Sequence, residues 1–299
     1  MEKNIQKTNI PQETNEYGYI PTIDLNCDLA QSWGIYKHAN EEAILPFVTS
    51  VNIACGGHAG DFASISKALR MAKERKLVVG AHIGYPDPVN FGRKEIPFVF
   101  EELQYCITSQ LSFIIGIAKN LNIEIAYVRP HGALYYRCGA DLAFAESVAK
   151  IIAKVSSWLY FVMPCGGINL SSVHENVGLR TIGEMHLDKI YRKDLSRKQT
   201  FSNLAKFQTF EQALAQAKSL IYQNRVLIKG NKKVRAPFRT IHLTADKPYS
   251  VELAEAVHKM LTNVKRLSSF TSVGDYTDFQ IDDLNEDIKF SENLKYVHI

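Results

Sequence analysis

The sequence predicts an α/β fold, a single β/α barrel of about seven parallel strands. Short β-rich segments alternate with longer amphipathic segments along most of the 299 residues, a pattern typical of parallel strands joined by helical crossovers. Polar side chains come just after six of the seven expected strands: Asp28, His58, His82, His131, Glu184 and Asp246. A barrel gathers residues from many strand ends, whereas an open sheet binds ligand at one crevice, so this distribution favours the barrel.

Seven segments are rich in β-branched and apolar residues and are expected to form the strands. They are residues 23–29, 50–56, 76–84, 124–130, 158–164, 179–185 and 239–244. Five segments between them carry apolar residues at spacings of three and four, which predicts amphipathic helices. These are residues 62–76, 100–121, 140–155, 210–224 and 250–261.

The barrel domain is expected to span residues 22–265, between a flexible polar arm (1–21) and an acidic tail (266–299). The hydrophobic fraction of 46% and the charged fraction of 22% are those of an ordinary globular protein, which excludes disordered, collagen-like and small disulfide-bonded classes. The net charge of +4 is too small to indicate nucleic acid.

The location is predicted from the cysteines and from the start of the chain. Five widely spaced cysteines without a CxxC pair are expected to be free thiols in a reducing compartment. The polar start lacks a signal peptide, and no apolar segment approaches the ~18 residues that cross a bilayer. We therefore expect a cytoplasmic protein that does not enter a membrane.

Charge is unevenly distributed near the end of the chain. Thirteen basic and two acidic residues lie between Lys189 and Arg239, whereas seven acids and two lysines lie between Thr271 and Ile299. A solvated dipolar surface explains this pattern, and docking of an anionic substrate or an acidic partner is the alternative.

Candidate chemical groups begin on the first strand. Asp24, Asn26 and Asp28 alternate and therefore project to one face. Buried carboxylates need a cation, a histidine or arginine, or raised pKa values that suit acid/base chemistry; Asp28 has a turn or helix cap as its alternative role. After the second strand come His58 and Asp61, among glycines that permit close backbone approach, and Asp61 is also a candidate helix N-cap.

The third and fourth strands end in further imidazoles. His82 is followed by a loop that contains Arg93, and Arg129 and His131 follow the same pattern one strand later. Three strand-end histidines near acids suit general acid/base catalysis or a divalent metal of the zinc type. No phosphate loop, GxGxxG, HExxH or GxSxG motif occurs, so the standard nucleotide-binding and nucleophile loops are excluded.

Five segments together resemble one family in order and spacing. DLNCDLAQSWG, SVNIACGGHAGD, VVGAHIGYPD with FGRKE, VRPHGALYY and GEMHLDKIY resemble the LamB/YcsF family, which is that of the 5-oxoprolinase A subunits. The resemblance covers Ile23 to Leu261. It implies a barrel similar to those of glycoside hydrolases and polysaccharide deacetylases.

The resemblance also implies an activity and partners. Members of this family work with 5-oxoprolinase subunits B and C to open the lactam of 5-oxo-L-proline to L-glutamate, with hydrolysis of ATP by the complex. The implied catalytic residues are Asp24, Asp28, His58, Asp61, His131 and Glu184. The implied substrate-binding residues are Asn26, Asn52, His82, Tyr85, Arg93, Arg129, Tyr135, Asp188 and Asp246. A divalent metal is an additional candidate cofactor.

The chain departs from the family pattern at several positions. Gln31 replaces a glutamate, and Thr244 replaces the histidine of CvHGD, which reads HLTAD here. Arg129 replaces a lysine, Ile83 a proline and Lys189 an arginine. Two alternatives to the family activity therefore stay open. One is a metal-dependent, deacetylase-like hydrolase with His58, Asp61, His82 and His131 as ligands; the other is a catalytically silent scaffold or binding protein of the same fold.

Overall fold

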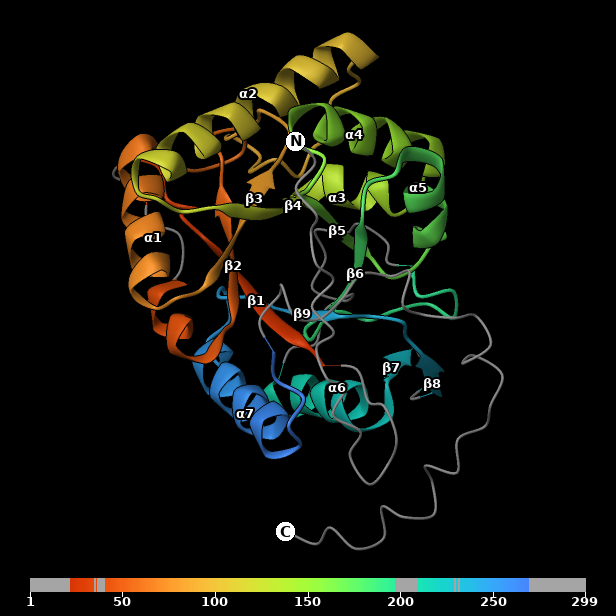
Figure 1. Cartoon of the computed structure of the whole chain (residues 1–299). Coiled ribbons are helices and arrows are strands. Elements are labelled where there is room, and N and C mark those ends of the chain that lie inside the picture. Colours follow the sequence, from red (N-terminus) through yellow and green to blue (C-terminus); the bar gives the residue numbers. More distant parts are fainter. Residues whose placement is uncertain are drawn as a thin grey trace, which may run out of the picture.

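The computed structural model describes residues 22–34, 36, 41–196, 209–228, 230 and 232–268. Seven parallel strands close into a barrel in the order β1-β2-β3-β4-β5-β6-β9, with β9 pairing β1 (Figure 1). The strands are β1 (Asp24–Leu29), β2 (Ser50–Ala54), β3 (Val78–Ile83), β4 (Ile125–Pro130), β5 (Tyr160–Pro164), β6 (Thr181–His186) and β9 (Thr240–Leu243). The predicted fold class, a single barrel of about seven strands, is confirmed.

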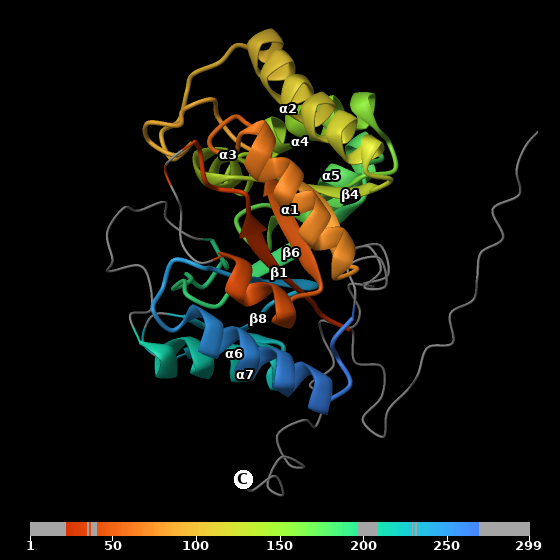
Figure 2. The same cartoon turned by 90° about the vertical axis from the view of Figure 1, so that its left-hand side faces the viewer.

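Helices surround the barrel, and α6 and α7 lie side by side along one flank (Figure 2). The five predicted helices are α1 (Phe62–Glu74), α2 (Phe100–Asn120), α4 (Leu142–Val155), α6 (Phe210–Gln223) and α7 (Ser250–Asn263). Sequence periodicity missed the short helices η1 (Glu41–Phe47), α3 (Gly132–Cys138) and α5 (Leu170–Val177), and the hairpin β7 (Arg225–Ile228) and β8 (Lys232–Arg235). A helix of seven or eight residues has only about two turns, too few apolar positions to establish a helical period, and β8 (KKVR) is three-quarters basic.

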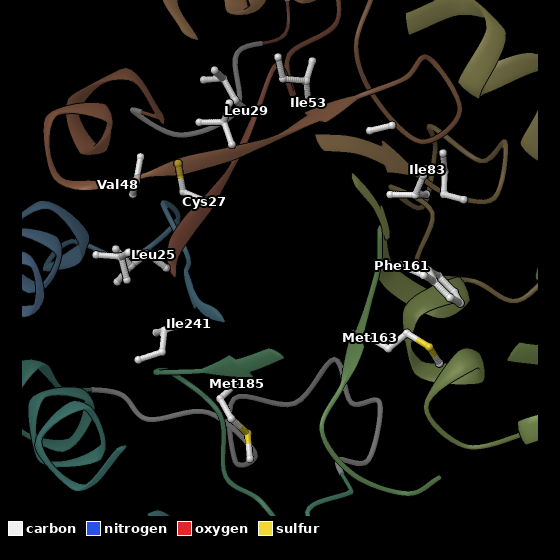
Figure 3. Close-up of a cluster of buried hydrophobic side chains, with 14 of the residues drawn as sticks. Leu25, Cys27, Leu29, Val48, Ile53, Ile83, Phe161, Met163, Met185 and Ile241 are labelled. Carbon is white, nitrogen blue, oxygen red and sulfur yellow. The ribbon is translucent and has the colours of Figure 1, made fainter. Parts of the chain in front are cut away.

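The hydrophobic core lies between the strands and the helices. Leu25, Cys27 and Leu29 alternate along β1 and are buried, and Figure 3 shows them with apolar side chains of β2, β3, β5, β6 and β9. Residues at the intervening positions, such as Asn26, face the barrel interior and are buried as well. Each strand is therefore apolar on its outer face, and the polar side chains are gathered inside.

A second, smaller apolar cluster contains Tyr127, Val162 and Ile182 of three neighbouring strands. Tyr127 fits because β3 has a glycine beside it: a Cβ on Gly80 would lie 2.0 Å from the Tyr127 Cε2 atom. The tyrosine hydroxyl donates to Asn52 Oδ1 at 2.8 Å. The Tyr127 ring therefore packs with Val162 and Ile182 on the apolar side, while its hydroxyl reaches the polar side chains of the barrel interior.

The last described residues of the chain lie beside the first ones. The Ile23 amide donates to the Arg266 carbonyl at 2.7 Å, and the Ser268 amide donates to the Ile23 carbonyl at 3.1 Å, so residues 266–268 lie against the residue that precedes β1. The predicted domain boundary at 265 stays a prediction. The predicted arm (1–21) and residues 269–299 of the predicted tail lie outside the described residues. Within the described part of the chain, no helix is long and apolar enough to cross a membrane.

Gly80→Ala is expected to lower the free energy of unfolding by about 1–3 kcal/mol, because its methyl group overlaps the Tyr127 ring. Gly116→Ala is the matched control: no atom lies within 4 Å of its added Cβ in α2, so about 0.5–1 kcal/mol of stabilisation is expected. Urea unfolding measures both changes. Equal effects of the two substitutions would contradict this packing.

Candidate functional site

The polar side chains inside the barrel come from strands that are distant in sequence. Asp28, His82 and Glu184 lie within the last residues of β1, β3 and β6, whereas they were predicted just past strand ends. His58, His131 and Asp246 do follow β2, β4 and β9. Because parallel strands all end at the same rim, these residues, apart from the exposed Asp246, gather in one mouth.

Asp24 begins β1 and is fully buried among hydroxyl groups. Its carboxylate accepts hydrogen bonds from Thr49 at 2.7 Å, Ser50 at 2.8 Å and Thr240 at 2.6 Å. Burial nevertheless raises the pKa of Asp24 from 3.8 to about 6, since three neutral donors compensate only part of the lost hydration.

A layer of amides lies one step further along β1. Asn26 donates from Nδ2 to Thr240 Oγ1 at 2.6 Å and to Glu184 Oε1 at 3.2 Å. Its Oδ1 atom accepts from Asn52 Nδ2 at 2.7 Å. Asn52 also donates to Asp28 Oδ1 at 3.0 Å. The two asparagines therefore link the carboxylates of Glu184 and Asp28. The substrate-binding role predicted for them stays a prediction.

Arg129 lies at the centre of the mouth and pairs with two carboxylates. Its Nε and Nη2 atoms donate to the two oxygens of Glu184 at 2.7 and 2.8 Å, a bidentate arrangement. Its Nη1 atom donates to Asp28 Oδ1 at 3.2 Å. The guanidinium also lies 5.0 Å from the ring centroid of Tyr135. All five donors of a buried arginine need such acceptors.

These pairings alter the acidities of all three groups. Burial would raise the pKa of Glu184, but Arg129 and His186 hold it well below its ordinary value. Burial acts the same way on Asp28, and its neighbours His82, His242 and Arg129 hold its pKa well below 3.8. Glu184 and Asp28 raise the pKa of Arg129 in turn, against the effect of burial. The site therefore contains permanent charges at neutral pH.

Three histidines form a second cluster beside Asp28. His82 Nδ1 faces the Arg129 carbonyl at 3.0 Å, and His131 Nε2 faces the Phe91 carbonyl at 2.8 Å. A carbonyl oxygen only accepts, so both of these nitrogens carry a hydrogen. The opposite nitrogens, His82 Nε2 and His131 Nδ1, then face each other at 3.0 Å. A proton or a metal cation between them removes the repulsion of two lone pairs.

His58 completes the cluster without a hydrogen bond to either ring nitrogen from the described residues. Its ring stacks on His131, with centroids 3.8 Å apart and planes at 2°. Gly84 and Gly92 make room for it, since an added Cβ would lie 2.7 Å from His58 Nδ1 and from His58 Cβ, respectively. Burial lowers the pKa values of His58 and His131 well below the ordinary value, so both are neutral at pH 7.

Two further histidines were missed by the sequence analysis. His186 Nε2 lies 2.9 Å from Glu184 Oε2, and His242 Nδ1 lies 2.8 Å from Asn26 Oδ1. His186 comes two residues after Glu184 on β6, and His242 comes two residues after Thr240 on β9. Each histidine therefore shares the interior face of its strand. The alternation that identified Asp24, Asn26 and Asp28 would have identified them too.

Other predicted residues lie around this centre. Asp188 is buried beside Lys189, which holds its pKa well below 3.8 against the effect of burial. The Arg93 guanidinium lies 5.3 Å from the Phe91 ring centroid, next to the histidines, while Asp246 is exposed. Buried Tyr85 packs edge-on against Phe98, with ring centroids 6.0 Å apart.

Asp61 is the N-cap of α1, the alternative considered for it. Its Oδ1 accepts from the Ser64 amide at 2.7 Å, and its Oδ2 accepts from the Gly34 amide at 2.8 Å. Both oxygens thus hold backbone groups in place. The catalytic role predicted for Asp61 stays a prediction.

The two departures from the family pattern have different surroundings. Gln31 Nε2 donates to Asp28 Oδ2 at 3.3 Å, so position 31 contacts the charged centre. Thr244 follows β9, and its buried hydroxyl has no hydrogen-bond partner among the described residues. Substitution at 31 therefore acts directly on Asp28.

Comparison with known proteins identifies the family of this chain. The LamB/YcsF family model matches residues 23–273. The chain belongs to the LamB/YcsF family. The 5-oxoprolinase A subunit of Tolumonas auensis is 32% identical over 80% of this chain and 95% of its own length. The corresponding protein of Chloroflexus aurantiacus is 37% identical over 58% of this chain and 68% of its own. The resemblance predicted from the sequence is confirmed.

A solved structure supports the same LamB/YcsF fold. The crystal structure of a lactam utilization protein from Thermus thermophilus superimposes with a TM-score of 0.76 and 27% sequence identity. The match covers 83% of this chain and all of that protein. The barrel fold of this chain is therefore shared with a protein whose name refers to lactams.

The raised pKa of Asp24 predicts a pH dependence of stability. In the unfolded chain Asp24 loses its proton near 3.8, whereas in the folded protein it does so near 6. Between these values the folded state binds more protons, so the free energy of unfolding falls as pH rises, by about 3 kcal/mol from this group.

Carboxyl-carbon NMR, assigned with Asp24→Asn, is expected to show a titration midpoint near 6 for Asp24. In urea unfolding, Asp24→Asn is expected to lack the fall of about 3 kcal/mol in the free energy of unfolding that Asp24 causes between pH 4 and 6. A midpoint at or below 4 would contradict the burial argument.

Proposed function

We propose that this chain is the A component of an ATP-dependent 5-oxoprolinase, which hydrolyses the lactam of 5-oxo-L-proline to L-glutamate. Subunits B and C are the proposed partners, and the complex uses ATP. The observation that carries the proposal is the buried centre of Arg129, Glu184 and Asp28 at the barrel mouth, in a chain whose relatives bear the name of this enzyme. We place the complex in the cytoplasm, because the five cysteines are free thiols.

The chemistry of a lactam explains why such a site is needed. A five-membered cyclic amide is unreactive at neutral pH, and phosphorylation of its oxygen by ATP provides a leaving group. Two waters are consumed overall, one in opening the ring and one in releasing phosphate, and the products are glutamate, ADP and phosphate. The residues of this chain then supply proton transfer and charge stabilisation around the carbonyl carbon.

We assign the roles by position. Asp28 is the most accessible carboxylate of the centre, with 17% of its side chain exposed, so the substrate meets it first. Arg129 stabilises negative charge that develops on the exocyclic oxygen of the lactam, since Glu184 holds its guanidinium rigidly. Arg93, beside the histidine cluster, anchors the carboxylate of 5-oxoproline.

Glutamate release from 5-oxoproline tests the proposal. We expect release by this chain only when ATP and the B and C subunits from the same source are present. His58→Ala is expected to abolish release while the melting temperature stays within a few degrees, because a polar residue of a barrel mouth serves the site more than the core.

No release beside an active relative used as a positive control would reject the proposed activity and favour a silent scaffold. The variant carrying Gln31→Glu and Thr244→His then separates two causes. Release restored by it would assign the loss to these departures, and continued inactivity would assign it to a different substrate.

A metal-dependent hydrolase is the second candidate, favoured by the facing nitrogens of His82 and His131. Donor atoms of His58, His82 and His131 all lie within 4.8 Å of one another. Zinc takes imidazole nitrogens at about 2.0–2.1 Å, and the 3.0 Å separation of His82 and His131 suits two such bonds. A bound metal would polarise a carbonyl group or activate water.

The third histidine fits less well. An imidazole binds a metal in the plane of its ring, and the rings of His58 and His131 lie in parallel planes with centroids 3.8 Å apart. His58 would therefore have to rotate to share an ion with His131. Asp61, the fourth ligand considered, holds the start of α1.

Metal analysis distinguishes the candidates. For the proposed 5-oxoprolinase component we expect substoichiometric zinc and manganese after purification, and turnover that is unchanged when this chain alone is treated with chelators before assembly. One equivalent of metal, lost together in His82→Ala and His131→Ala but retained in His174→Ala outside the cluster, would favour the metal-dependent hydrolase.

A further inference from the structure

His242 lies at the centre of the barrel mouth although no motif drew attention to it. On β9 it is paired with Asn26 of β1 on one side and with His186 of β6 on the other. Only 4% of its side chain is exposed. The ring of His186 packs against it at a tilt of 52°, with centroids 4.5 Å apart. The imidazole is thus held between two strands.

A chain of amides determines which nitrogen of His242 carries the hydrogen. The Asp28 carboxylate only accepts, so the Asn52 atom 3.0 Å from it is the amide nitrogen. That nitrogen also donates to Asn26, whose own nitrogen donates to Glu184 at 3.2 Å. The orientation of both amides is therefore set by carboxylates, and Asn26 presents its oxygen to His242.

The oxygen of Asn26 lies 2.8 Å from His242 Nδ1, so this nitrogen donates. The lone pair of the neutral ring is then on Nε2. His242 Nε2 lies 3.7 Å from Asp28 Oδ2, the accessible carboxylate of the site. A proton taken up at Nε2 would produce an imidazolium beside an existing negative charge.

The charges around His242 come from three strands and one loop. Burial and the positive field of Arg129 on β4 lower its pKa to about 4, against the opposing fields of Asp28 on β1, Glu184 on β6 and Asp188 after β6. The ring is therefore neutral at pH 7 and its Nε2 is able to accept a proton.

The other histidines of the mouth are engaged differently. His186 Nε2 is occupied by two partners, the Glu184 carboxylate at 2.9 Å and Arg129 Nη2 at 3.2 Å. The lone pairs of His82 and His131 face each other. His58 stacks on His131, and no hydrogen bond from the described residues orients it. His242 combines a fixed tautomer, a lone pair and a neighbouring carboxylate.

We propose that His242 is the general base of lactam opening, an assignment that rests on the proposed function. Its Nε2 takes a proton from a water molecule while the water oxygen bonds to the ring carbonyl carbon. When the bond between this carbon and the ring nitrogen breaks, the proton passes to that nitrogen, and an amine and an acyl phosphate result. The second water then releases phosphate and leaves the carboxyl group. The bond from Nδ1 to Asn26 holds the ring throughout.

His242→Asn tests the assignment, because the asparagine amide keeps the donor to Asn26 and removes Nε2. In the reconstituted complex we expect kcat to fall 10²- to 10⁴-fold, with KM and urea unfolding little changed. The matched control is His258→Asn on α7, whose Nδ1 faces the Phe47 carbonyl at 3.0 Å outside the mouth. The control is expected to keep full kcat.

Nitrogen NMR of the histidine rings gives a second measurement that does not depend on turnover. At pH 7 the His242 ring is expected to carry its hydrogen on Nδ1 and a bare Nε2. A hydrogen on Nε2, or a kcat reduced less than threefold in His242→Asn, would overturn the base assignment alone. Absence of turnover in the wild-type complex would overturn the proposed function together with it.

Discussion

The buried ion pair of Arg129 and Glu184 is the interaction on which the barrel interior depends. Two N–H groups of the guanidinium contact two carboxylate oxygens at 2.7 and 2.8 Å, with almost no exposure to solvent. Moving the two charges out of water costs several kcal/mol per ion. A buried pair of this kind therefore adds little net stability to the fold. Its presence inside a barrel that could have been filled with apolar side chains is better explained by a requirement of the site.

Other features of the mouth follow from this pair. The remaining arginine donor is directed to Asp28, which keeps its charge and faces the opening. Asp28 and Glu184 orient the two asparagines, and the asparagines orient His242. The proton position on His242 is thus determined by the permanent charges of Asp28 and Glu184. Pre-oriented groups of this kind need little rearrangement during a reaction.

Local patterns in the sequence predicted the barrel because strand and helix periods alternate clearly from β1 to α7. Asp24, Asn26 and Asp28 were identified because side chains at every second position of a strand point to the same face. The partners of Arg129 were beyond prediction, since they depend on which strands are neighbours and on their stagger. Comparison with the family pattern shows that Thr244 stands where the family has a histidine. That comparison did not indicate a role for His242, two residues earlier, whose side chain lies inside the barrel.

A double-mutant cycle between Arg129 and Glu184 tests the central claim most directly. The free energy of unfolding is measured for Arg129→Met, Glu184→Leu and the double variant. Each single change is expected to cost about 3–5 kcal/mol, because it leaves a buried charge without its bidentate partner. The double variant, in which only Asp28 loses an ion pair, is expected to cost clearly less than the sum of the two single changes. A loss of unfolding free energy in the double variant equal to the sum of the two single losses would contradict the claim that each buried charge depends on the other.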